Sequence, residues 1–252
     1  MSDVQVVIER RFRGPPNSVN GGYACGVAAS ALGIGTIEVT LHAPPPLERP
    51  VSITVDGGEA RLVDGHTTVA VARRSSVEIE VPPPVPYNTA RSAADAFDVA
   101  AYRSVHEFPE CFVCGPDRSE GDGLRILSAP SGDARMRIWP WIPHDSLFEH
   151  GALDVRLVWA ALDCPGGLAG LLAGDDAPPA VLGRLTATVN RRPEPGEPLV
   201  VAGWTGARQG RKTEAGTAIW SASGEVLAAG RATWIDLTPG QREAFAGTGT
   251  AA

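Results

Sequence analysis

The chain has 252 residues, of which 43% are hydrophobic and 20% are charged, and its formal net charge is -7 at pH 7. This length suits one large domain or two smaller ones that each bury a core, and the composition is that of an ordered soluble chain rather than a disordered one. The acidic balance excludes a general nucleic-acid binder, and no apolar run reaches the roughly 18 residues of a membrane-spanning helix, so we expect neither nucleic acid nor a membrane as a partner.

The N-terminal segment, MSDVQVVIERRFRG, lacks the basic and then apolar pattern of a secretory signal. The four cysteines are Cys25, Cys111, Cys114 and Cys164, which are too few and too scattered for a disulfide framework. We therefore expect a cytoplasmic protein with reduced thiols.

The first predicted element is a helix over 21–32, which begins inside the stretch GPPNSVNGGYACG. Asn20 suits the N-cap, but Gly21 and Gly22 follow it, and each glycine costs about 1 kcal/mol relative to alanine inside a helix. Two explanations are open. The glycines can leave backbone N–H groups open to a ligand at the positive end of the helix, or they can allow close packing of the helix on a sheet.

The next feature is an internal repeat. The stretch GTIEVTLHAPPPLERPVSITV and the stretch GRLTATVNRRPEPGEPLVVAG each read as strand, proline-rich turn and strand. A helical stretch precedes each copy, at 21–32 and at roughly 153–172. Many α+β segments share this character, yet a fixed offset favours a duplication. At that offset four residue types coincide: Gly35 with Gly183, Thr40 with Thr188, Pro45 with Pro193 and Pro50 with Pro198.

On this interpretation the chain has four parts. The first repeat spans 1–80 and the second spans 106–240. Between them, 81–105 reads as a linker with a stiff proline-rich start and a short amphipathic helix over 89–102. The last residues, 241–252, carry almost no core-forming side chains, so a flexible tail is expected there.

Four motifs resemble those of a known family. They are CFVCGPDRSEGDGLRI from Cys111, LVWAALDCPGGLAG from Leu157, GRKTEAGTAIWSASGEVLAAGRATW from Gly210, and VNGGY, in which Asn20 replaces the histidine of a His-Gly-Gly helix start. Over nearly its whole length the chain is similar to tandem, or double, hotdog acyl-CoA thioesterases of the phenylacetyl-CoA and fatty-acyl kind.

This resemblance implies an α+β fold in which a curled antiparallel sheet wraps a central helix, twice over. The two hotdog repeats would then form an intramolecular pseudo-dimer. The resemblance also implies hydrolysis of an acyl thioester, with coenzyme A as part of the substrate and no other cofactor. Proteins of this kind frequently form higher oligomers, so the resemblance is compatible with a homo-oligomer.

The resemblance places the reaction between the two predicted helices. Hydrolysis needs donors for the developing oxyanion and a carboxylate that activates water or attacks the carbonyl. Gly22, with Asn20 and Gly21 beside it, is the predicted donor site, and Asp163 is the predicted general base or nucleophile. Asp163 is flanked by apolar residues, where a charge is costly without a purpose, but it also suits the N-cap of a helix that restarts at Pro165.

One composite site per chain is expected, because the helix at 21–32 carries no carboxylate. The opposite combination, His150 and Gly151 against that helix, would be inactive. The acyl chain is expected to run between the two helices, past Tyr23 and Trp159.

Three cations, Arg208, Arg211 and Lys212, gather near the start of a predicted strand. They are candidates for binding the phosphates of coenzyme A, since guanidinium and ammonium groups pair strongly with phosphate. A solvated surface turn explains the same residues.

Cys111-x-x-Cys114, with His106 upstream, is half of a zinc pattern. A closed structural zinc site needs four ligands, and only these three lie close together in the sequence. Small buried thiols are the better interpretation, so no metal is expected.

Two other functions on the same fold stay open. A non-catalytic protein that binds an acyl or aromatic ligand is consistent with Asn20 in place of the family's histidine. An enoyl-thioester dehydratase needs a histidine and a carboxylate on opposed elements, for which His150 and Asp163 are the candidate pair. A serine hydrolase and a dinucleotide enzyme are disfavoured, because the chain has neither a G-x-S-x-G elbow nor a G-x-G-x-x-G after a strand.

Overall fold

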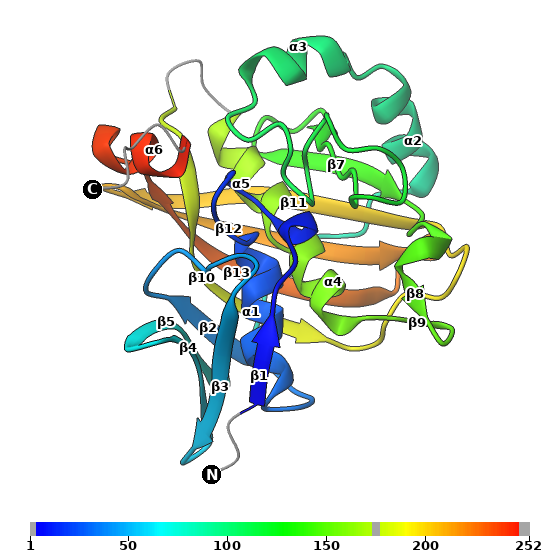
Figure 1. Ribbon diagram of the computed structural model, residues 1–252. Helices are drawn as coiled ribbons and strands as arrows, with labels where there is room; N and C mark the ends of the chain where they lie inside the picture. The colour runs from blue at the N-terminus through cyan, green and yellow to red at the C-terminus, as the bar shows by residue number, and fades with distance from the viewer. Residues whose placement is uncertain (1–3, 173–176, 247–252) are drawn as a thin grey trace.

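The computed structural model describes residues 4–172 and 177–246 and is built around one large antiparallel sheet (Figure 1). In chain order the strands are Val4–Val7 (β1), Ile37–Leu41 (β2), Pro50–Asp56 (β3), Glu59–Asp64 (β4), Thr67–Arg74 (β5), Ala129–Pro130 (β6), Met136–Trp141 (β7), Phe148–Glu149 (β8), Ala152–Leu153 (β9), Ala180–Val189 (β10), Leu199–Gln209 (β11), Lys212–Ser221 (β12) and Val226–Asp236 (β13). The sheet orders 11 of them as β1-β3-β4-β5-β2-β10-β13-β12-β11-β7-β6, and β8 pairs with β9 separately.

Six α-helices accompany these strands in the described part of the chain. They are Gly21–Ser30 (α1), Tyr87–Asp95 (α2), Val99–Val105 (α3), Val155–Ala161 (α4), Cys164–Leu171 (α5) and Pro239–Ala246 (α6), with 3-10 turns at Arg10–Phe12 and Asp145–Leu147. None of the helices within these described ranges has both the length and the apolar character to cross a membrane.

The two halves of the sheet, on either side of the central β2–β10 pair, have corresponding strand orders. Reading outward, β2 is followed by β5, β4, β3 and β1, and β10 is followed by β13, β12, β11 and β7. β2 and β10 run antiparallel, with Val39 opposite Leu185. The two strand–proline–strand stretches of the sequence therefore form β2 with β3 and β10 with β11.

α1 is the most buried helix of the first half, because its sequence is apolar or small on every side. All of its residues from Gly22 to Ala29 are buried. Asn20 begins the helix as expected: its side-chain oxygen accepts a 3.0 Å hydrogen bond from the backbone N–H of Tyr23. The helix ends at Ser30, two residues before the predicted end.

The second predicted helix, at roughly 153–172, is two helices. α4 ends at Ala161 and α5 begins at Cys164. Pro165 causes the break, because it lacks the N–H that a continuous helix needs and its ring collides with the preceding turn. The break leaves Asp163 between the helices, and its side chain makes no capping hydrogen bond to α5.

The segment at 81–105 does more than link the two halves. The single helix predicted over 89–102 is two helices, α2 and α3, because Asp98 starts a new helix by accepting a 2.9 Å bond from a backbone N–H of its first turn. α2 contributes Ala90 to a second apolar cluster, which also holds the fully buried Trp220. Side chains alternate along β12, so this cluster lies on the opposite face from α5.

The segment expected to be a flexible tail, 241–252, begins as part of a helix. α6 extends to Ala246, and its residues Gln241 and Phe245 line a cavity. Arg242 also connects α6 to Glu107: its guanidinium donates two hydrogen bonds, of 2.7 and 2.8 Å, to the Glu107 carboxylate. The remaining part of the expected tail, 247–252, lies outside the described residues.

Candidate active site

The cavity has a volume of about 570 Å³ and lies where the start of α1, the start of α5, β10 and α6 meet. Its lining is mostly apolar, and the volume is within the range of small-molecule sites. The residues that line it include Asn20, Gly21, Pro45, His106, Cys111, Cys114, Asp163, Cys164, Leu168, Leu182, Trp234 and Phe245.

Asp163 is a buried carboxylate in the wall of this cavity, and only 2% of the residue is exposed. Its Oδ2 atom accepts two hydrogen bonds, at 2.8 Å from Nδ2 of Asn20 and at 2.9 Å from the backbone N–H of Gly22. Its Oδ1 atom has no hydrogen-bond partner within the described ranges. Burial raises the pKa of Asp163 to about 7, although the bond from Gly22 lowers it. One oxygen is thus fixed and the other is available to accept a proton.

Gly22 allows this contact because it lets two helices meet. A Cβ at this position would lie 2.6 Å from the Asp163 Cβ and 2.6 Å from the Trp159 carbonyl oxygen. A Cβ at Gly26, one turn later, would lie 2.8 Å from the Arg156 Cα and 2.9 Å from the Trp159 Cβ. Gly22 and Gly26 therefore pack α1 against α4, whereas Gly21 packs against the sheet, since a Cβ there would lie 2.8 Å from the Cβ of Leu182 in β10. The Gly22 N–H, predicted to face the substrate, donates to Asp163 instead.

Gly21 and Asn20 have separate roles in the same turn. Gly21 is the first residue of α1, so its N–H has no partner inside the helix, and the residue lines the cavity. Asn20 is 2% exposed and uses both ends of its amide: the oxygen caps α1 and the nitrogen holds Asp163. Asn20 is therefore tied to the carboxylate, and Gly21 is the nearer candidate to contact a ligand.

The acyl path predicted past Tyr23 and Trp159 does not coincide with the cavity. Tyr23 stacks on Phe12, with ring centroids 4.1 Å apart, and Trp159 packs against Gly26. Neither aromatic residue is among the described residues that line the cavity. Gly22 and Gly26 bring α1 and α4 close together, and the cavity lies at the start of α1 instead.

The three predicted phosphate-binding cations lie beside α6 and outside the described lining of the cavity. Arg208 forms an ion pair with the carboxylate of Asp236. Arg211 donates to the Asp236 carbonyl oxygen at 2.7 Å and to the Gln241 side chain at 2.8 Å, and Gln241 does line the cavity. Lys212 is exposed. The cluster is close to the cavity rim, and its arginines already have protein partners.

The pair expected for a dehydratase does not form. His150 is exposed in the turn between β8 and β9, where its φ is 52°, and it is not among the described residues around the cavity. Two other histidines, His42 and His106, do line the cavity. Asp163 therefore has no opposed His150 across the cavity.

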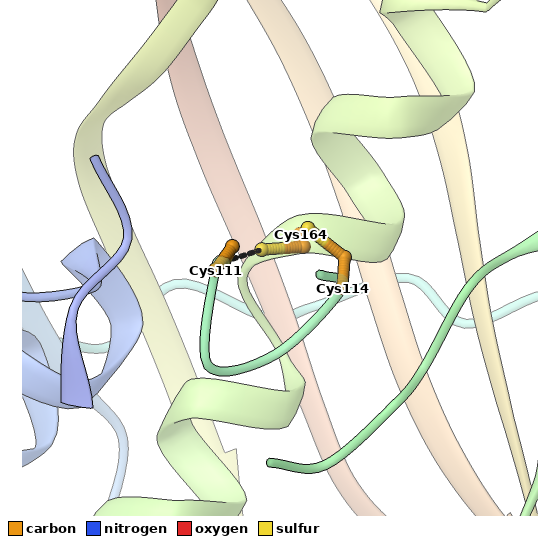
Figure 2. A group of neighbouring side chains, drawn as sticks. All are labelled: Cys111, Cys114 and Cys164. Atoms are coloured by element: carbon orange, nitrogen blue, oxygen red, sulfur yellow. Dashed lines mark hydrogen bonds between the residues drawn. The ribbon is translucent and has the colours of Figure 1, made fainter. Parts of the chain in front are cut away.

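The structure adds a third cysteine to the half zinc pattern of the sequence. Figure 2 shows Cys164, at the start of α5, beside Cys111 and Cys114. The Cys111 and Cys164 sulfurs are 3.7 Å apart, and all three sulfurs lie within 4.8 Å of one another. The Nε2 atom of His106 is 3.3 Å from the Cys114 sulfur. Sequence reasoning missed Cys164, although it directly follows Asp163, because the fold alone brings it to the other two.

The sequence matches no family model and no curated protein. Solved structures do match: an acyl-CoA thioesterase II from Mycobacterium marinum is 12% identical, with a TM-score of 0.56, over 94% of this chain and 93% of its own. A protein of unknown function with a hot dog fold, from Alicyclobacillus acidocaldarius, is 15% identical, with a TM-score of 0.56, over 94% of both chains. This chain has the hotdog fold.

The fold also occurs with a different chemistry. The dehydratase domain of a mycocerosic acid synthase-like polyketide synthase is 16% identical to this hotdog protein, with a TM-score of 0.59, over 93% of this chain and 90% of the domain. At such identities the likeness establishes the fold, and the chemistry has to be argued from the site.

Proposed function

We propose that this hotdog protein hydrolyses an acyl-CoA or related thioester, with Asp163 as the general base. The observation that carries the proposal is the carboxylate itself. Two N–H donors fix the Oδ2 atom of Asp163, whereas its Oδ1 atom has no hydrogen-bond partner in the described ranges. The residue lies in the wall of a mostly apolar cavity. A pKa near neutrality suits a general base.

The proposed reaction uses one water molecule. Oδ1 of Asp163 takes a proton as the water oxygen attacks the thioester carbonyl carbon. The N–H of Gly21, at the positive end of α1, stabilises the oxyanion that forms. The carbon–sulfur bond then breaks, and the departing thiolate takes the proton back from Asp163. The products are a carboxylic acid and a free thiol.

We further propose that the fold is a tandem duplication, with repeats at 1–80 and 106–240 joined by 81–105. The matching strand orders on either side of the β2–β10 pair support this proposal. In such a pseudo-dimer the site is composite, since the first repeat supplies Gly21 and the second supplies Asp163. α1 has no carboxylate of its own, so one site per chain is expected.

The cationic cluster provides a prediction about the coenzyme A part of the substrate. Lys212 is exposed, and its strand partner Ile235 lines the cavity. A charge-assisted bond to a phosphate contributes enough binding free energy to change the affinity about tenfold. Lys212→Ala should raise the KM for an acyl-CoA by about tenfold and leave kcat unchanged. The matched control is the pantetheine thioester of the same acyl group, which lacks the nucleotide phosphates. An equal KM change for both substrates would contradict a phosphate contact.

The proposed function is tested by supplying the purified protein with saturated, aromatic and 2-enoyl CoA thioesters and following free thiol and water addition together. We expect thiol release from saturated or aromatic substrates. Water addition to the enoyl substrate without thiol release would instead assign the dehydratase reaction of the polyketide synthase domain. Tight binding of acyl-CoA without any turnover would assign a ligand-binding role.

A further inference from the structure

The three cysteines at the cavity have the arrangement of a metal site. Two come from one turn, at Cys111 and Cys114, and the third begins α5, so the sulfurs approach from two separate parts of the chain (Figure 2). A tetrahedral zinc ion with bonds of about 2.3 Å to sulfur places two sulfurs about 3.8 Å apart. The Cys111 and Cys164 sulfurs are 3.7 Å apart.

A glycine closes the turn that carries Cys111 and Cys114. Gly115 donates its N–H to the Cys111 carbonyl oxygen at 2.9 Å, and a Cβ at Gly115 would lie 2.4 Å from that oxygen, so only glycine fits. Both cysteines therefore lie in one tightly closed turn, and the thiolate forms of cysteines are the forms that bind a metal.

We propose that Cys111, Cys114, Cys164 and His106 bind one zinc ion. The fourth ligand is Nε2 of His106, which lies 3.3 Å from the Cys114 sulfur, close to the edge of about 3.5 Å that tetrahedral zinc requires between nitrogen and sulfur. His106 is not in the group of ligand atoms that all lie within 4.8 Å of one another, so its ring has to move toward the other sulfurs on binding. Zinc is the metal that a tetrahedral set of three thiolates and one imidazole favours. All three thiols are buried, and their contact with the cavity provides the route for the ion.

Neighbouring groups support the ligands. Tyr102 packs edge-on against the His106 ring and donates its hydroxyl to the Cys114 carbonyl oxygen. The amide nitrogen of Asn20 lies 3.9 Å from the Cys111 sulfur and 3.7 Å from the Cys164 sulfur while it also donates to Asp163. This amide therefore separates the carboxylate from the thiolates. Such outer contacts orient ligands in metal sites.

One local change accompanies binding. Nδ1 of His106 accepts a 3.1 Å bond from the Phe108 N–H, so in this arrangement Nε2 carries the ring proton. Ligation through Nε2 moves the ring proton to Nδ1, and the Phe108 N–H gives up this contact. Three thiol protons leave to solvent as three sulfur–zinc bonds form, so binding should weaken as the pH falls.

The zinc would hold the segment at 106–114 to the residue directly after Asp163. Its role is to position this wall of the cavity, and it takes no part in the proposed hydrolysis. The inference therefore stands independently of the proposed function.

The test is the metal content of the full chain, purified without chelators or a metal-affinity tag. We expect one zinc per chain by mass spectrometry, and, after exchange with Co²⁺, the visible bands of a tetrahedral thiolate site. Cys164→Ser and His106→Ala should lose the metal. Cys25→Ala, at another buried cysteine in α1, should keep it, and so should Asp163→Asn.

Two outcomes would overturn the zinc site. One is a wild-type protein that contains no metal and binds neither added Zn²⁺ nor Co²⁺. The other is a metal-free native protein in which peptide mass spectrometry finds Cys111 and Cys164 joined as a disulfide. The metal content of the wild-type protein shows whether the zinc site exists, even if a ligand variant fails to fold. Thiol release is a separate measurement, so loss of one proposal leaves the other in place.

Discussion

Replacing Asp163 by asparagine should lower the rate of thioester hydrolysis by about 10²–10⁴-fold, the usual contribution of a positioned acid or base. Asparagine has nearly the same shape, and its side-chain oxygen can still accept the bonds from Asn20 and Gly22. It cannot take a proton from water at neutral pH. The effect should appear in kcat, with the melting temperature unchanged.

The matched control is Asp154→Asn, at the N-cap of α4. Asp154 accepts a hydrogen bond from the Arg156 N–H, and asparagine caps a helix as well as aspartate does. Activity should stay close to that of the wild type. If Asp163→Asn also retains full activity while folded, Asp163 is not the general base and the proposed site is wrong.

Gly22→Ala should damage both stability and activity. The added Cβ would lie 2.6 Å from the Trp159 carbonyl oxygen and the Asp163 Cβ, and 3.1 Å from the Ala160 Cα, so side-chain rotation alone cannot relieve the contact. Forcing α1 and α4 apart should lower the free energy of unfolding by about 1–3 kcal/mol. It should also break the 2.9 Å bond to Asp163. Urea denaturation and thiol release would measure the two effects.

Gly240→Ala is the control for this substitution. Gly240 lies in α6, and a Cβ there would meet no atom within 4 Å. Alanine is the better helix former, so stability should rise slightly or stay the same. If Gly22→Ala is as stable and as active as Gly240→Ala, the close contact between α1 and α4 is not required.

The sequence was informative where local chemistry decides the structure. Asn20 predicted the start of α1, and Pro165 predicted the break after Asp163. Alternating residues around proline-rich turns predicted the strands β2, β3, β10 and β11. The pairing of Gly22 with Asp163 also followed from the family resemblance. Its geometry did not: the N–H was predicted to face the substrate, and it faces the carboxylate.

Features that depend on long-range packing were not accessible from the sequence. The cavity lies away from the acyl path predicted past Tyr23 and Trp159. A spacing pattern cannot reveal which surfaces of two helices meet. Cys164 lies far along the chain from Cys111, so ligand counting in the sequence found only two of the three thiolates. α6 had too few apolar residues to predict that it would line the cavity.

The central claim is that the protein hydrolyses a thioester with Asp163 as the general base. Its most direct test is to let the purified protein act on an acyl-CoA in water enriched in oxygen-18 and to measure the mass of the released acid by mass spectrometry. Hydrolysis at Asp163 predicts that each acid molecule formed in a single turnover carries one oxygen from the solvent. Asp163 itself should stay unlabelled, because it moves only a proton. Unchanged acyl-CoA, or a product that keeps its thioester, would contradict the account.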